Sequence, residues 1–174
     1  MEQSRKQEEI IKMERVHRIC THPLYVECME KNRQEEMNRI FCGHDMQHFL
    51  DVARIGWILC LERKLNISKE MMYAAAFLHD IGRGMQYREG VHHDEASVLL
   101  AGHILPECGF SAVQTKEICD AIAGHRMSNG EAKLRTDLGE ILEKADHASR
   151  CCFACEAEHE CYWPKEKKNL EIRM

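Results

Sequence analysis

Apolar residues recur along the chain at the three- and four-residue spacing of amphipathic helices, and this pattern continues over almost the whole sequence. No segment is a convincing strand. We therefore expect an all-α bundle of about six to eight helices. The pattern predicts helices over residues 3–19, 23–40, 44–64, 68–80, 92–105, 111–124 and 136–158.

Capping and turn residues mark several of the predicted helix ends. Ser68 can cap the fourth helix by accepting a hydrogen bond from a free backbone N–H, and Ser111 with Gln114 forms a capping-box pattern at the sixth. Pro106 is expected to stop the fifth helix. Residues 82–90, GRGMQYREG, are predicted to form a loop, and a loop beside a rigid core is a natural place for function.

Length and composition restrict the class of protein. The 174 residues suit one compact domain, with a central part over about 40–150 and a Cys-rich helix end and tail over 151–174, in which Trp163 is expected to pack back on the body. A net charge of −5 speaks against a broadly basic surface, so we expect no nucleic-acid polymer as partner. The N-terminus is charged and no run of about 18 apolar residues occurs, which favours a cytoplasmic protein without a membrane span.

The chain contains 10 cysteines, which we expect to be mostly reduced thiols in the cytosol. Four of them crowd together near the C-terminus: Cys151, Cys152, Cys155 and Cys161. Cys152 and Cys155 have the C-x-x-C spacing of zinc sites, and His159 lies nearby. Only one such pair is present, so a thiol-rich helix end packed on the body is the favoured interpretation and a structural metal is the alternative.

Histidines and acidic residues indicate a metal site. His44 and His48 are four residues apart and share one helix face. His79 and Asp80 follow AAAFL, which is apolar on every side and so is expected to cross the centre of the domain. Asp146 follows apolar residues on the last helix. A buried carboxylate needs a compensating partner, and a metal ion is one such partner.

Three segments together resemble the signature of a known family. HFLDVARIG, AAAFLHDIGR and EKADHASR are similar to the motifs of the HD superfamily of metal-dependent phosphohydrolases, over about residues 40–150. The resemblance implies an all-α fold and a metal centre. It assigns four metal ligands: His48, His79, Asp80 and Asp146. His44 is the alternative to His48 as the first ligand, or else a residue that faces the substrate.

The resemblance also implies that a second metal ion can bind. Some branches of the family use two further histidines, one at the start of the helix after the HD pair and one after an AI pair. His93 fits the first position, with His92 as the close alternative, and His125 fits the second. Imidazole and carboxylate ligands suit one or two divalent ions of iron, manganese, zinc, cobalt or nickel.

The implied activity is hydrolysis of a nucleotide or another small phosphate ester by metal-activated water. Asp80 is then a catalytic residue that bridges metals or orients the nucleophile, and Arg83 offsets the developing charge. Four residues are candidates for binding the substrate: His44, Arg126, Lys144 and Arg150. The Glu after HD that marks deoxynucleotidases and the GYP segment of cyclic-dinucleotide hydrolases are both absent, so the substrate stays open.

Two other functions fit the same residues. A di-iron oxygenase uses a similar six-ligand arrangement in a distant relative of the family. A non-catalytic, metal-bearing nucleotide sensor would keep the ligands without turnover. As partner we expect a small phosphorylated substrate, with a nucleotide as the favoured one, and a homodimer is possible.

Overall fold

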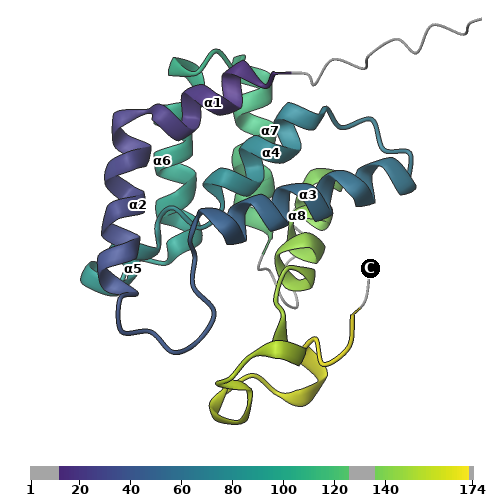
Figure 1. The fold of residues 1–174 in the computed structure, drawn as a ribbon. Coiled ribbons are helices and arrows are strands. Elements are labelled where there is room, and N and C mark those ends of the chain that lie inside the picture. The colour runs from purple at the N-terminus through teal and green to yellow at the C-terminus, as the bar shows by residue number, and fades with distance from the viewer. Residues whose placement is uncertain (1–11, 126–135, 173–174) are drawn as a thin grey trace, which may run out of the picture.

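The computed structural model describes residues 12–125 and 136–172. Over these residues the chain forms eight α-helices, three 3-10 turns and no strand (Figure 1), so the predicted all-α fold is confirmed. The predicted helical residues 3–11 lie outside this part. The helices are α1 (Glu14–Thr21), α2 (Pro23–Glu35), α3 (Met46–Glu62), α4 (Lys69–Leu78), α5 (Arg83–Glu89), α6 (His93–Glu107), α7 (Ala112–Gly124) and α8 (Asp137–Ala148).

Helix α4 forms the centre of the bundle, as its uniformly apolar sequence predicts. Every residue from Met72 to Leu78 is buried, and α4 packs against α1, α3, α6, α7 and α8. Its start follows the predicted cap, because the Ser68 hydroxyl accepts a hydrogen bond from the backbone N–H of Met71. None of the helices in the described residues is both long and apolar enough to span a bilayer.

Two helix boundaries of the N-terminal half differ from the predicted ones. Helix α2 ends at Glu35 rather than near residue 40, because the Glu36 carboxylate turns to accept hydrogen bonds from the backbone and ring of His44. Residues 83–89, predicted as loop, form α5, which Gly90 ends at a φ of 74°. Glycine adopts such a positive φ without strain, so Gly90 in the sequence is the residue that could have indicated the end of a short helix.

Two later boundaries also differ. Pro106 lies inside the last turn of α6, where it removes only one hydrogen bond, and the helix continues to Glu107. The last long helix stops at Ala148 instead of residue 158, and 3-10 turns follow. The tail folds back beneath α8 (Figure 1), where Asn169 donates to the carbonyl of His147 and Trp163 stacks on the His147 ring at 6.0 Å.

Gly82 allows α6 to approach the end of α4. A Cβ atom at Gly82 would lie 2.6 Å from the His93 carbonyl oxygen and 2.6 Å from the Ala96 Cβ, both parts of α6. The Gly82 N–H also donates to the Ser97 hydroxyl at 2.9 Å. The missing side chain therefore brings the first turn of α6 against the residues that follow α4.

We predict that Gly82→Ala lowers the free energy of unfolding by about 1–3 kcal/mol, since backbone atoms must move apart to admit the methyl group. Gly102→Ala within α6 is the control, because nothing lies within 4 Å of its Cβ position. That control should raise stability by up to about 1 kcal/mol through helix propensity. Urea unfolding of both variants measures the difference, and equal stabilities would contradict the packing argument.

Candidate metal centre

Two groups of ligand-type side chains meet in the middle of the bundle. His48, His79, Asp80 and Asp146 form one group, and the other consists of Asp80, His93 and His125; within each group the ligand atoms lie within 4.8 Å of one another. Asp80 belongs to both groups. It is completely buried, and its carboxylate lies 3.4 Å from His79 Nε2 and 3.3 Å from His93 Nε2.

The local sequence explains how the first group is placed. His48 lies in the first turn of α3, where the N-cap Asp45 accepts a hydrogen bond from its backbone N–H at 2.9 Å. His79 and Asp80 follow directly on the buried helix α4, so the backbone carries them into the core. Asp146 lies in the C-terminal half of α8, with Oδ1 3.3 Å from His48 Nε2.

The second group is completed by the ends of two helices. His93 is the first residue of α6 and His125 directly follows α7. Both are buried, whereas the alternative His92 is exposed and lies outside the two groups. The chain thus brings together the six residues that the sequence analysis favoured as metal ligands, from five separate elements.

Hydrogen bonds to the backbone fix the orientation of two of the imidazole rings. His79 Nδ1 lies 2.7 Å from the Ala76 carbonyl and His125 Nδ1 lies 2.5 Å from the Ile122 carbonyl. A carbonyl only accepts, so Nδ1 carries a proton in both rings, and Nε2 is the ring nitrogen that faces the centre. Each Nε2 is buried without a hydrogen-bond partner among the described residues, which is the arrangement of a histidine that binds a metal.

The two carboxylates carry negative charge into this centre. Burial would raise the pKa of the Asp80 carboxyl, but the charges of His79 and Arg83 hold it well below its usual value. Burial would also raise the pKa of Asp146, but the neighbouring His48, His79 and Arg150 hold it well below its usual value. Two anions beside imidazole Nε2 atoms fit a divalent cation both in charge and in ligand type.

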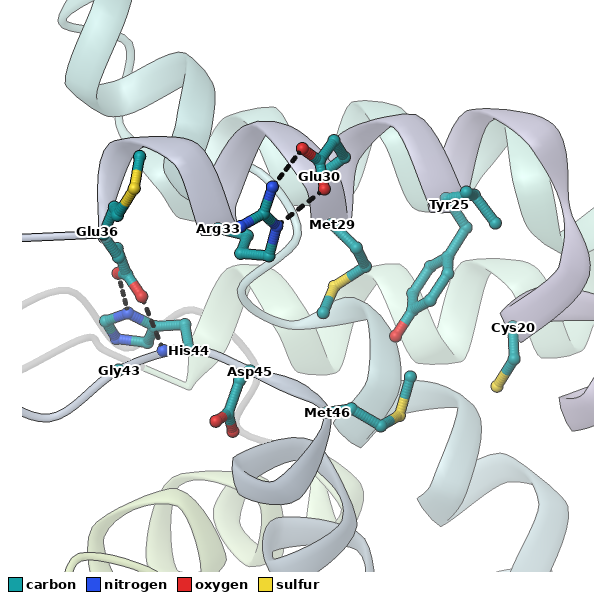
Figure 2. A pocket seen from close by; sticks show the side chains of 12 residues that line it. Cys20, Tyr25, Met29, Glu30, Arg33, Glu36, Gly43, His44, Asp45 and Met46 are labelled. Carbon is teal, nitrogen blue, oxygen red and sulfur yellow. Dashed lines mark hydrogen bonds and ion pairs between the residues drawn. The ribbon is translucent and has the colours of Figure 1, made fainter.

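His44 lies beside the centre rather than in it. Its Nε2 is 3.4 Å from Asp80 Oδ2, but it belongs to neither group of mutually close ligand atoms, whereas His48 belongs to the first group. On the other side of the ring, Nδ1 donates to Glu36 Oε1 at 2.5 Å, and the backbone N–H donates to Oε2 at 2.8 Å (Figure 2). Glu36 thereby fixes the His44 ring with one edge toward Asp80.

The predicted cationic residues divide into two kinds. Arg83 Nε donates to Asp80 Oδ1 at 3.0 Å and Arg150 Nη2 donates to Asp146 Oδ1 at 3.0 Å, and both side chains are buried at the centre. Lys144 is exposed and pairs with Glu140 on its own helix. Arg126 lies outside the described residues.

A cavity of about 910 Å³ reaches the centre from the side of α8. His125 and Asp146 line it together with Lys144 and the tail residues Trp163 and Lys167. Acidic side chains of α8 line it as well, so the cavity is strongly charged. The C-terminal tail is therefore one wall of an approach to the metal centre.

The cysteine-rich tail does not join the metal centre. Neither group of close ligand atoms in the described residues contains a cysteine, and all four C-terminal cysteines are free thiols. Cys152 is buried and Cys151 is exposed. Packing of these thiols against the body remains the favoured interpretation.

Three residues that support the centre were not predicted from the sequence. Buried Asn32 on α2 donates to the Asp80 carbonyl at 3.1 Å and accepts from the Gly84 N–H at 2.6 Å. Ser97 on α6 accepts from the backbone of the same turn, and Glu36 fixes His44. Helix α2 is rich in polar residues, so no periodic pattern distinguishes the polar residue that is buried.

Comparison with known proteins agrees with this geometry. Residues 46–151 match the family model described as HD domain, which covers more than half of the chain, and the protein therefore belongs to the HD domain family. An uncharacterised protein of Clostridium beijerinckii is 36% identical over 160 residues, which are 92% of this chain and 99% of that protein. The crystal structure of a predicted HD superfamily hydrolase from an uncultured Thermotogales bacterium aligns with a TM-score of 0.59 and 24% identity, over 83% of this chain and 81% of that chain.

We predict that Asp80→Asn removes all bound divalent metal, because Asp80 belongs to both ligand groups. His125→Gln should leave only the ion of the first group, so its metal content should fall by about half. His103→Gln, an exposed histidine on α6, is the matched control and should keep the full content. Elemental analysis of the purified variants, with circular dichroism to verify helical content, measures this. Full metal content in Asp80→Asn would reject the shared ligand.

Proposed function

We propose that the protein is a metal-dependent phosphohydrolase that acts on a nucleotide or another small phosphate ester. The observation that carries this proposal is the position of Asp80 in two ligand groups at once. A carboxylate shared in this way can hold two cations close together, as two-metal hydrolases require. The similar structure described as a predicted HD superfamily hydrolase supports the same reaction class.

The donor set fits divalent transition metals. His48, His79 and Asp146 would hold one ion with Asp80, and His93 and His125 would hold a second. Iron, manganese, zinc, cobalt and nickel all accept such mixed imidazole and carboxylate ligands. When bound, these ions lower the pKa of water toward 7 and polarise a phosphoryl oxygen.

The remaining task of the chain is to bind and orient the phosphate. Arg83 and Arg150 each contact one of the site carboxylates, so their guanidinium groups lie where they can also donate to phosphate oxygens. Positive charge held at that point stabilises the negative charge that develops during phosphoryl transfer. His44, which is oriented by Glu36, faces Asp80 and can donate to or accept from a substrate group there.

Elemental analysis followed by a substrate screen tests the proposal. Purified protein is loaded with each candidate metal in turn and incubated with nucleotides and sugar phosphates, and phosphate release is measured. Release that depends on the metal supports a phosphohydrolase. Oxygen uptake by the iron-loaded protein, without phosphate release, would instead indicate an oxygenase. Tight nucleotide binding with no turnover under any metal would indicate a sensor.

We predict that Arg83→Ala lowers kcat by about 10²–10³-fold while metal content is retained, because it removes a cation from the developing charge. Arg83→Lys keeps the positive charge but lacks the paired N–H donors of the planar guanidinium group, so it should recover only part of the wild-type kcat. Arg54→Ala, an exposed arginine on α3, is the control and should behave as the wild-type protein. A wild-type kcat in Arg83→Ala would rule out this role.

A further inference from the structure

A second cavity, of about 600 Å³, lies between α2 and the start of α3 (Figure 2). The side chains of Met29 on α2 and Met46 on α3 extend into it from opposite sides, and the Tyr25 ring lies beside them. Thioether side chains are flexible and polarisable, and they make favourable contacts with aromatic rings. This part of the cavity therefore suits a flat, apolar-faced group.

The hydroxyl of Tyr25 has no hydrogen-bond partner among the described residues, although the side chain is only 1% exposed. Figure 2 shows it directed between Met29 and Met46, into the cavity. A buried hydroxyl without a partner opposes folding, and native proteins seldom retain one without a reason. A ligand with a polar atom at its edge would supply the missing bond.

The charges around this cavity exclude a phosphate. Glu36 and Asp45 contribute carboxylates at the end nearest the metal centre. Among its described lining residues the cation is Arg33, which is paired with Glu30 at 2.7 Å. The cavity lined by Lys144 and the tail, in contrast, has lysines as well as carboxylates in its lining, together with two candidate metal ligands.

His44 connects the two regions. Its ring lines the cavity on the side of Glu36, and its Nε2 faces Asp80 at 3.4 Å. One molecule can therefore have an uncharged end between the methionines and a charged end at the metal centre. A volume of about 600 Å³ is within the range of small-molecule sites.

We propose that this cavity binds the nucleobase of a nucleotide, with Met29 and Met46 against the faces of the ring and the Tyr25 hydroxyl bonded to a polar atom at its edge. The inference rests on the proposed function only for the position of the phosphate. The base site itself is built from residues that belong to neither ligand group.

Calorimetric titration of the full-length, metal-free protein with adenosine, guanosine, cytidine and uridine tests the site, because nucleosides carry no phosphate. At least one should bind. Tyr25→Phe should weaken that binding by about three- to tenfold, the usual effect of one hydrogen bond. The same variant should melt at the wild-type temperature or above, since the lost hydroxyl has no partner in the protein.

A pair of tryptophan variants completes the test. Val26 lines the cavity and is 52% exposed, so Val26→Trp should fill the cavity and abolish nucleoside binding. Val113→Trp on α7, at a position 67% exposed and outside the cavity lining, should bind as the wild-type protein does.

Two results would overturn the base site. The first is that no nucleoside binds the wild-type protein, whatever the phosphohydrolase assay shows. The second is binding that survives in Tyr25→Phe and Val26→Trp but is lost in Trp163→Ala, which would move the base to the charged cavity. Nucleoside binding with the expected variant effects, without hydrolysis of any nucleotide, would support the base site and reject only the proposed reaction.

Discussion

A completely buried carboxylate controls the arrangement of this protein. Asp80 follows a helix that is apolar on all sides, so its charge lies deep in the bundle, where lost hydration must be compensated. The compensation comes from several elements at once: His44, His79, His93 and Arg83 all approach its two oxygens within 3.4 Å. The ends of the surrounding helices converge on Asp80 because the charge cannot be satisfied by its own helix.

The turn that carries Asp80 is held from both sides. Asn32 on α2 bonds the carbonyl of Asp80 and the N–H of Gly84, and Ser97 on α6 bonds the N–H of Gly82. Gly82 leaves no space between this turn and α6, where any side chain would collide with backbone. A carboxylate held on such a turn keeps its position relative to its neighbours, and a rigid support of this kind is what a metal site needs for its geometry.

Much of this arrangement could be predicted from the sequence, because it depends on local patterns. The apolar run in α4 predicts a central helix, and the motif segments point to His48, the HD pair and Asp146, which the fold brings close together as candidate ligands. Contacts between distant residues could not be predicted. Helix α5, the early end of α8 and the supporting role of Asn32 all depend on partners far away in the sequence, such as Asn169 for the end of α8.

The end of α2 illustrates how such a contact also shapes the candidate site. Glu36 leaves the helical path to accept three bonds, from the His44 backbone, the His44 ring and the Tyr87 hydroxyl. Burial would raise the pKa of Glu36, but the bonds from His44 and Tyr87 lower it to about 2, so it is an anion over the physiological range. That anion fixes the proton of His44 on Nδ1 and turns Nε2 toward Asp80. The periodic pattern thus predicts the end of α2 wrongly at the place where Glu36 holds His44. Through this contact His44 lies between the cavity beside Tyr25 and the candidate metal centre.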